Sequence, residues 1–250
     1  GAFTRELEDA LRARRIDLAV HSLKDLPTTL AEDLALGAVS LRADPADALV
    51  GRTWDELAGS HPAKQPWRIG TSSLRRRALV RRLLPQAEVV DLRGNVETRL
   101  RKVAQGELDA AVLACAGLIR LGQAERIVER LDPARFPPAP GQGALAVEIR
   151  TDDDATREIV RCVHDANSAA CTTAERAVLS GLGGGCHIPL GAWAELRDHR
   201  LTLRAVVLAP DGERILESDA QGPPESAEQL GRTVAQNLLG RGAAEIIAAA

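Results

Sequence analysis

Hydrophobic and polar positions follow two different periods at the start of the chain. Between residues 5 and 14 the apolar residues recur with helical spacing, and between residues 16 and 21 they alternate with polar ones as in a strand. The strand pattern leads into Lys24 and Asp25, and Pro27 then stops regular structure. We therefore expect Lys24 and Asp25 at the carboxyl end of a strand, where ligands bind in open α/β sheets.

The apolar positions in the middle of the chain also switch between helical and strand spacing. Thr53 and Glu56 have the spacing of a capping box, and the hydroxyl residues 71–73 come just before a helix expected from Leu74. Strands that alternate with helices predict a parallel, doubly wound sheet. The other elements expected here are strands at 67–70, 89–92 and 110–113 and a helix at 96–103.

Proline-rich segments mark where the chain passes between domains. An apolar run at 34–41 precedes Asp44-Pro45, which we interpret as a crossing, and residues 137–141 (PPAPG) form a rigid connector. The apolar strand pattern at 144–149 is expected to return to the first domain, which gives two hinge strands. We expect domain 1 to comprise 1–44 and 141–163, domain 2 to comprise 45–140, and domain 3 to comprise 164–250.

The last third of the chain has the pattern of a smaller α+β domain. A helix is expected to end near Leu182, and strands are expected at 188–196 and 201–208. The Asp211-Gly212 turn leads to a further strand at Ile215. Ser226 and Gln229 have the spacing that caps a helix, so we expect them to begin a final long helix.

Composition narrows the class of protein. The 250 residues contain no apolar run near the roughly 20 residues that span a bilayer, and the start of the chain does not resemble a signal peptide, so we expect a soluble, cytoplasmic protein with no membrane partner. The four cysteines lack metal-ligand spacing, so we interpret them as reduced thiols and expect no metal site. Absence of Tyr, with only two Phe, argues against nucleic acid, because single-strand binders need stacking platforms.

Arginines are clustered although the net charge is −3, which favours a small anionic ligand over a polyanion. In the segment 70–76 (GTSSLRR), hydroxyls and amides at a helix N-terminus come next to Arg75 and Arg76, and guanidinium groups bind carboxylate or phosphate in a bidentate manner. Arg93 and Arg99 belong to the next strand-to-helix turn. The arginines for which a solvent-exposed helix face explains the pattern better are Arg77, Arg81, Arg82 and Arg101.

Two further residues stand out for their chemistry. A partly apolar pocket around Asp25 would tune its carboxyl group for proton transfer. The equal alternative is that Lys24 and Asp25 form a simple ion pair or cap the next turn. Three consecutive glycines, 183–185, precede Cys186 and leave room for a bulky group at the thiol, whereas a small buried hydrophobic residue is the alternative. His187 is not expected to act as a base for Cys186, because adjacent strand residues point to opposite faces. His21 is interpreted as a satisfied strand residue.

Five motifs together resemble the porphobilinogen deaminase (hydroxymethylbilane synthase) family, and the likeness runs from Phe3 to the C-terminus. The motifs are residues 17–27 (DLAVHSLKDLP), 70–76 (GTSSLRR), 92–95 (LRGN), 140–144 (PGQGA) and 184–186 (GGC). The resemblance implies an α/β fold with two periplasmic-binding-protein-like, doubly wound domains and a smaller C-terminal α+β domain. It also implies a dipyrromethane cofactor joined to Cys186 by a thioether.

The resemblance implies roles for individual residues. Asp25 is expected to be the general acid and base that assists loss of ammonia from porphobilinogen and steadies the cationic azafulvene and pyrrole intermediates. Four additions would give the linear tetrapyrrole, released by hydrolysis, while the primer stays on Cys186. Residues expected to hold the acetate and propionate groups are Ser22, Lys24, Arg75, Arg76, Arg93, Arg99 and Arg120. Their expected hydrogen-bonding neighbours are Thr71, Ser72, Ser73, Asn95 and Gln142.

Two alternatives and one departure accompany this interpretation. A noncatalytic carboxylate-binding protein on the same scaffold would need no pyrrole on Cys186. A cysteine hydrolase would need a nearby base, which the sequence does not locate. The family has a further βα region before the position of Gly1, so we expect the N-terminal part of domain 1 to be missing. We expect a monomer whose partner is the small molecule porphobilinogen.

Overall fold

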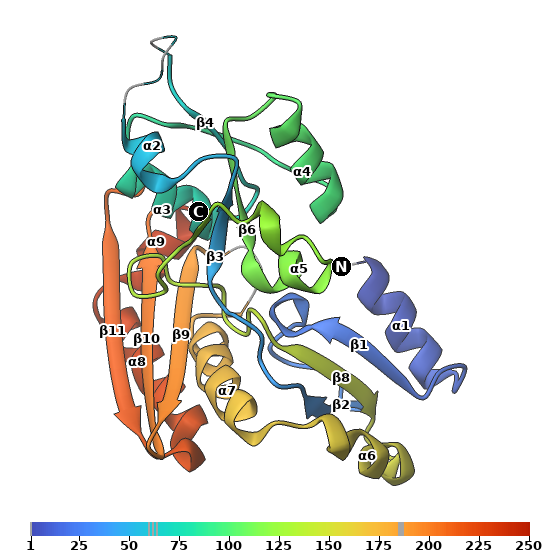
Figure 1. The fold of residues 1–250 in the computed structure, drawn as a ribbon. Coiled ribbons are helices and arrows are strands. Elements are labelled where there is room, and N and C mark those ends of the chain that lie inside the picture. Colours follow the sequence, from blue (N-terminus) through green and yellow to red (C-terminus); the bar gives the residue numbers. More distant parts are fainter. Residues whose placement is uncertain (1, 60, 62, 64, 185–187) are drawn as a thin grey trace.

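Three separate β-sheets organise the chain in a computed structural model (Figure 1). The structure describes residues 2–59, 61, 63, 65–184 and 188–250. In strand order, the sheets are β1-β8-β2, β5-β4-β6-β3-β7 and β11-β10-β9. The fold is therefore mixed α/β, as the sequence predicts. None of the helices in the described ranges is long and apolar enough to cross a membrane.

In the first sheet, β8 (Leu145–Arg150) lies between β1 (Leu18–Ser22) and β2 (Leu34–Val39) and is antiparallel to both. This confirms the prediction from the pattern at 144–149 that the chain returns there to pair with the first strands of the fold. A 3₁₀ turn, Leu23–Asp25, follows β1 directly. The helices of this part are α1 (Ala2–Arg12) and α6 (Asp154–Val160), followed by a 3₁₀ turn at Arg161–Val163.

In the second sheet, β4 (Arg68–Gly70) is parallel to both of its neighbours, β5 (Glu88–Val90) and β6 (Ala110–Ala114), as predicted. The strand β3 (Asp47–Val50) runs antiparallel to β6 and to the short β7 (Glu129–Arg130). The chain thus passes from the first sheet to the second through the connector before β3, and back through the connector before β8. Both β3 and β8 lie antiparallel between their neighbours. The helices are α2 (Trp54–Ala58), α3 (Leu74–Leu83), α4 (Val96–Ala104) and α5 (Cys115–Arg120), with a 3₁₀ turn at Ala124–Arg126.

The helices of the second part begin at capping residues that the sequence marks. Thr53 and Glu56 form the predicted capping box of α2. The Ser73 side chain accepts a hydrogen bond from the Arg76 amide at the start of α3, and Asn95 caps α4 through the Thr98 amide. These caps fix the point where each helix leaves the sheet edge.

The third sheet is an antiparallel meander of β9 (Leu190–Arg197), β10 (Arg200–Leu208) and β11 (Ile215–Gly222). Two long helices, α7 (Ala166–Gly181) and α8 (Ala227–Gly240), share a core with it, and α9 (Ala243–Ala248) completes that core. Ser226 is the N-cap residue of α8, which confirms the predicted start of the helix, but the predicted side-chain cap is absent. The Ser226 side chain makes no capping bond, because a 3₁₀ turn at Pro224–Ser226 already leads the backbone into α8.

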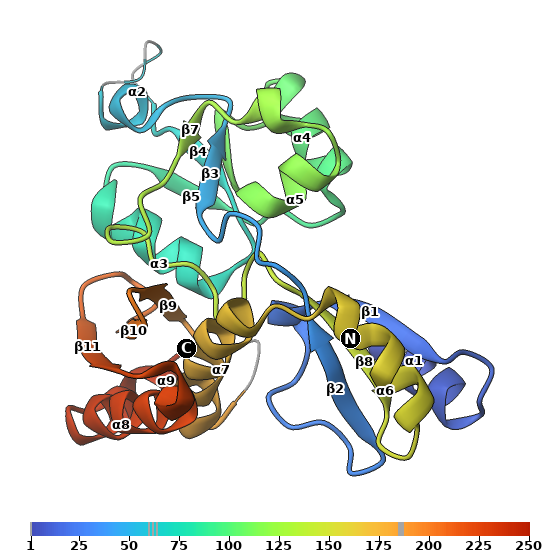
Figure 2. The same cartoon turned by 60° about the horizontal axis from the view of Figure 1, so that its bottom comes forward.

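The third sheet also packs on the second part of the chain. Val206 and Leu208 of β10 are buried in the same hydrophobic cluster as Leu79 of α3. Figure 2 shows α3 next to this sheet, and α7 between the third sheet and the connectors. The carboxyl end of β1, the start of α3 and the connector at 137–144 therefore converge on one region.

Candidate active site

A cavity of about 240 Å³ lies where the three sheets meet. Its wall comes from the turn after β1, the first turn of α3, the second connector, the end of α7 and the entry to β9. The lining residues are Lys24, Asp25, Ser72, Ser73, Leu74, Arg75, Arg76, Ala139, Pro140, Gln142, Leu179, Ile188 and Leu190. Seven residues predicted for the site are thus brought together from three distant segments.

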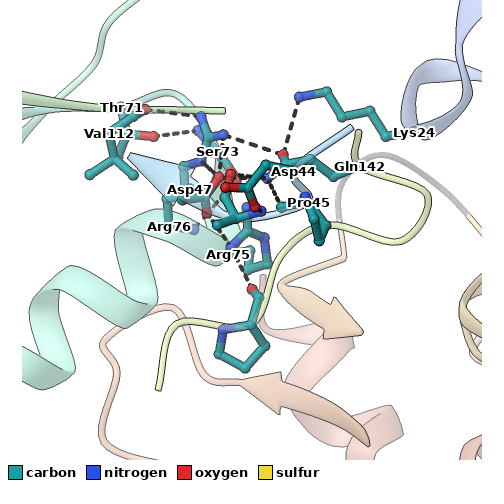
Figure 3. A network of polar contacts seen from close by, with 12 residues as sticks. Lys24, Asp44, Pro45, Asp47, Thr71, Ser73, Arg75, Arg76, Val112 and Gln142 are labelled. Atoms are coloured by element: carbon teal, nitrogen blue, oxygen red, sulfur yellow. Dashed lines mark hydrogen bonds and ion pairs between the residues drawn. The ribbon is translucent and has the colours of Figure 1, made fainter. Parts of the chain in front are cut away.

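The cations of this cavity are organised by a carboxylate, Asp47, that is completely buried at the start of β3. Arg75 Nη1 lies 2.8 Å from Asp47 Oδ2, and Arg76 Nη2 lies 2.7 Å from Asp47 Oδ1. Arg76 also donates from Nε to Asp47 Oδ1 at 3.2 Å. Figure 3 shows the two guanidinium groups on either side of this one carboxylate.

The electrostatics of the cluster follow from this arrangement. Burial alone would raise the pKa of Asp47, but the charges of Arg75 and Arg76 outweigh it and hold the pKa well below its usual value. Burial, and then the neighbouring Arg76, lower the pKa of Arg75, while Asp47 opposes that change. Asp47 is therefore ionised at neutral pH, and one negative charge faces two positive ones.

Gln142 connects the arginine cluster to Lys24. Its Nε2 donates to Asp47 Oδ1 at 2.8 Å and to the Pro45 carbonyl at 2.7 Å, so the two connectors are tied together. Its Oε1 accepts from Lys24 Nζ at 3.2 Å. Burial, reinforced by the charge of Arg76, lowers the pKa of Lys24 to about 8. The ammonium group thus sits among cations and is poorly solvated.

Asp25 differs from the other charged groups of the cavity because its residue is exposed. No hydrogen bond of its carboxylate occurs among the described residues. The alternative of a simple ion pair with Lys24 is not seen there either, because the ammonium group turns to Gln142 instead. A carboxylate with free oxygens at the edge of a cationic cavity can accept and return a proton.

The hydroxyl residues before α3 have mostly backbone partners. Ser72 Oγ donates to the Leu92 carbonyl at 2.6 Å, and Ser73 caps the helix. Thr71 is buried, and its Oγ1 accepts from the Ser73 amide at 3.2 Å. Ser72 and Ser73 line the cavity, whereas Thr71 shapes the turn behind them.

The remaining predicted residues lie outside the cavity lining. Arg93 is largely exposed and pairs with Asp91 at 2.9 Å, and Arg99 donates to the Gly94 carbonyl at 2.9 Å. Burial, and then the charge of Arg76, lower the pKa of Arg99, so this guanidinium still belongs to the cationic region. Arg120 donates to the Gly143 carbonyl at 2.7 Å. The two others outside the lining are Ser22, which is exposed, and Asn95, which caps α4.

Cys186 and His187 lie outside the described residues, so their predicted roles are not addressed by the geometry. The chain on either side of them is described. Ile188 lines the cavity. A Cβ added to Gly184 would lie 2.7 Å from Thr28 Oγ1, close to the turn that carries Asp25. The described residues on both sides of Cys186 therefore lie near the site, Gly184 beside Thr28 and Ile188 in the cavity lining.

Asp47 is the site residue that our sequence interpretation missed. It opens the apolar run Asp47-Ala48-Leu49-Val50, just after Pro45. A single carboxylate at the start of a buried strand needs a charge partner, because an unpaired buried charge is very costly. That was the available signal, but nothing in the sequence names the partners.

Unused hydrogen-bond donors indicate what kind of ligand the cavity fits. Arg75 Nη1 contacts both Asp47 and the Pro137 carbonyl, whereas its buried Nε has no acceptor in the described part of the chain. Lys24 is a third cation, so the three cations Lys24, Arg75 and Arg76 outnumber the two carboxylates of this region, Asp25 and Asp47. A ligand that carries several carboxylates, as a dipyrromethane with acetate and propionate side chains does, fits this donor set.

Comparisons with known proteins agree with this chemistry. The family model "Porphobilinogen deaminase, dipyromethane cofactor binding domain" matches residues 1–158, and "Porphobilinogen deaminase, C-terminal domain" matches residues 169–240. The porphobilinogen deaminase of Syntrophobacter fumaroxidans is 46% identical over 247 residues, covering 99% of this chain and 79% of that protein. That of Chromobacterium violaceum is 50% identical over 249 residues, covering 100% of this chain and 80% of that protein.

Among solved structures, the periplasmic VFT2 domain of Bordetella pertussis BvgS matches 63% of this chain and 64% of its own, with a TM-score of 0.36 and 21% identity. The two family models together reach from the first residue into α8, and both curated relatives exceed 45% identity. The chain belongs to the porphobilinogen deaminase family.

Proposed function

We propose that the cavity between the three sheets is the active site of this chain and that Asp25 is the group that transfers protons in it. As a member of its family, the chain is a transferase that joins four porphobilinogen molecules into the linear tetrapyrrole hydroxymethylbilane, with release of ammonia, on a covalently bound dipyrromethane primer. The observation that carries the proposal is the convergence of Asp25, Lys24, Arg75, Arg76 and Gln142 on one cavity.

The charge balance of the cavity supports a carboxylate-rich ligand. We propose that Arg75 and Lys24 receive the acetate and propionate groups, because Arg75 has an unused Nε and Lys24 is a poorly solvated cation. Arg76 is already engaged with Asp47 and with the Val112 carbonyl at 3.0 Å, so it supplies mainly positive charge and holds the cluster in place. Further out, Ser22, Arg93, Asn95, Arg99 and Arg120 are proposed to meet the lengthening chain.

The proposed work of Asp25 follows from the bonds that change. In each addition a C–N bond breaks, ammonia leaves, a C–C bond forms and a pyrrole α-carbon loses its proton. Asp25 donates a proton toward the departing amine, and its carboxylate later accepts the proton from the α-carbon, so the residue returns to its starting state. While ionised, it also offsets positive charge near the reacting atoms. The dipyrromethane would supply the free α-carbon for the first addition, and the pyrrole added last would supply it for each later one.

We propose Cys186 as the point of attachment. Ile188 lines the cavity and Gly184 approaches Thr28, so the segment between them starts and ends within reach of the site. Glycines before the thiol leave room for two pyrrole rings. In this role the sulfur is an anchor that does not turn over.

The proposal includes the three domains expected from the sequence. Domains comprising 1–44 with 141–163, 45–140 and 164–250 agree with the assignment of strands to three separate sheets. We propose that the protein works as a monomer in the cytoplasm. In support of that compartment, Cys115, Cys162 and Cys171 are free thiols, the state that a reducing environment maintains.

The experiment that tests the proposal is the substitution Asp25→Asn in the holoenzyme. Intact mass should show the dipyrromethane adduct retained, while ammonia release falls by about 10²-fold or more, the usual contribution of a general acid–base group. The control is Asp154→Asn, because that carboxylate is 98% exposed and remote from the cavity. Normal ammonia release by Asp25→Asn would overturn the assigned role, and an unmodified Cys186 would favour a noncatalytic carboxylate-binding protein.

A further inference from the structure

Arg176 of α7 contacts the turn that carries Asp25. Its Nη1 donates to the Leu23 carbonyl at 3.2 Å and to the Leu26 carbonyl at 3.1 Å, and its Nη2 donates to the Pro27 carbonyl at 2.6 Å. One guanidinium group from the third part of the chain thus binds three backbone carbonyls of the first part. The planar, forked geometry of arginine suits such an arrangement, because its donors point in fixed directions.

Other contacts also hold this turn: the Leu23 amide donates to the Ala144 carbonyl at 3.0 Å, and the Leu23 and Leu26 side chains are buried. Residues 23–25 form a single 3₁₀ turn, closed by a long bond of 3.3 Å from the Leu26 amide to the Leu23 carbonyl. Of the three carbonyls that Arg176 contacts, that of Leu23 also accepts the bond that closes the turn, and a cation placed at the end of a helical turn is favourable. Because the Asp25 carboxylate has no hydrogen bond within the described residues, the backbone of the turn alone sets its position.

Among the described residues, the side chain of Arg176 donates only to these three carbonyls. No carboxylate oxygen lies within 4.0 Å of its guanidinium in the described ranges. Burial lowers the pKa of Arg176, which reflects the cost of keeping its charge away from water. A partly buried cation whose acceptors are all carbonyls of one short turn is suited to fixing that turn.

The same helix leads to the segment proposed to carry the cofactor. Arg176 comes ten residues before Cys186, and the approach of Gly184 to Thr28 gives a second contact between the end of α7 and the chain just after the turn. The chain from Leu23 to Thr28 therefore meets α7 and the residues just after it at two places, Arg176 and Gly184.

We propose that Arg176 is a positioning residue for the reaction. It fixes the backbone of residues 23–27, and so holds the Asp25 carboxylate in place at the cavity. The inference rests on the proposed role of Asp25. It adds that Asp25 stays next to α7 while other parts of the chain adjust to the growing product. A displacement near 1 Å of a catalytic group costs about 10²-fold in rate.

Three variants of the holoenzyme test the inference: Arg176→Gln, Arg176→Lys and the control Arg81→Gln. Arg81 also bridges two parts of the chain, through Nη1 to the Pro210 carbonyl at 2.8 Å, but lies outside the cavity lining. For Arg176→Gln we expect the cofactor mass to be retained, kcat to fall about 10- to 100-fold and KM to change less than about twofold. Arg176→Lys should recover part of kcat, and Arg81→Gln should keep it.

A double variant separates this inference from the role of Asp25. If Arg176 acts through Asp25, adding Arg176→Gln to Asp25→Asn should lower the residual single-turnover rate by less than about twofold. Multiplied losses in the double variant, or a normal kcat in Arg176→Gln, would overturn the inference and leave the assignment of Asp25 intact. A fall in kcat that only mirrors the unfolded fraction, measured by thermal unfolding, would also overturn it. Normal turnover in Asp25→Asn is the separate result that removes the proposed role of Asp25.

Discussion

Glu175 and Arg42 form a two-point ion pair, with Arg42 Nη1 2.7 Å from Glu175 Oε1 and Arg42 Nη2 2.9 Å from Glu175 Oε2. The carboxylate is completely buried on α7 and also accepts from the Gly141 amide at 2.7 Å and the Ala194 amide at 2.8 Å. Arg42 belongs to the first connector and Gly141 to the second, while Ala194 belongs to β9. One side chain therefore ties both connectors to the third sheet.

We expect Glu175→Gln to destabilise the protein by about 3–5 kcal/mol, because it leaves Arg42 as an uncompensated buried charge. The free energy of unfolding from urea denaturation measures this. Glu217→Gln is the control, since Glu217 pairs with Arg204 at 2.7 Å but both side chains are substantially exposed, and we expect it to cost less than about 1 kcal/mol. Equal losses in the two variants would show that burial of the Glu175 pair is not what matters.

Local elements of this fold follow from local sequence signals. The start of α3 at Leu74 and the capping box at Thr53 depend on residues within one or two turns, and both occur as predicted. At Ser226 the same kind of signal fails, because the neighbouring Pro224 already begins a helical turn that makes the side-chain cap unnecessary. A competing local preference therefore decided that position.

The site is harder to predict because its contacts are long-range. The sequence shows that Arg75 and Arg76 begin a helix, and this favours a ligand as their partner. Their principal partner in the structure is Asp47, which lies on a different strand, and no periodicity links residues so far apart. Arg93 has the same kind of position in sequence, yet it pairs with Asp91 at the surface. The direction of each side chain depends on packing that sequence spacing does not encode.

Asp47 should be more important to stability than its single charge suggests. We expect Asp47→Asn to cost about 3–5 kcal/mol at pH 7, because Arg75 and Arg76 would lose their shared buried counterion. Its lowered pKa means that this contribution is fully present above the ordinary value near 3.8 and is lost as the pH falls below it. The difference in unfolding free energy between parent and variant should therefore be the same at pH 7 and pH 5.

The control for Asp47 is Asp91→Asn, whose carboxylate pairs with Arg93 at the surface. It should leave the free energy of unfolding close to that of the parent, because solvent screens an exposed pair. If the difference between parent and Asp47→Asn halves between pH 7 and pH 5, the ionised state assigned to Asp47 is incorrect.

Lys24 predicts a pH dependence of substrate capture. Its pKa, lowered to about 8 by burial, implies that the ammonium charge is lost as the pH rises above that value. We expect kcat/KM to decline above pH 8, approaching a tenfold loss per unit, because binding of substrate carboxylates needs the charge. Lys24→Arg should remove this decline, since arginine stays charged, even if the absolute value is lower.

Stability should respond to Lys24 with the opposite sign. The folded-state pKa lies below the ordinary 10.5, so between pH 8 and 10.5 the unfolded chain holds the proton more tightly, and this residue's contribution to stability rises with pH. Lys102→Arg is the control, because Lys102 is a partly exposed residue on α4 whose nearest acidic partner, Glu107, is 3.9 Å away. A decline in kcat/KM that persists unchanged in Lys24→Arg would assign it to another group.

Gly231 allows α8 to pack closely on the helix that carries Glu175 and Arg176. A Cβ at this position would lie 2.5 Å from the Ala177 Cβ and would also collide with the Ala174 carbonyl, so one helix must move. We expect Gly231→Ala to destabilise the protein by about 1–3 kcal/mol. Because the displaced α7 also holds the Asp25 turn through Arg176, kcat should fall as well.

Gly240→Ala is the matched control at the end of α8, where nothing lies within 4 Å and alanine should be neutral or stabilising by up to about 1 kcal/mol. Measured unfolding free energies that are equal for the two variants would mean that α7 and α8 can separate at no cost, and that the position of Arg176 does not depend on their contact.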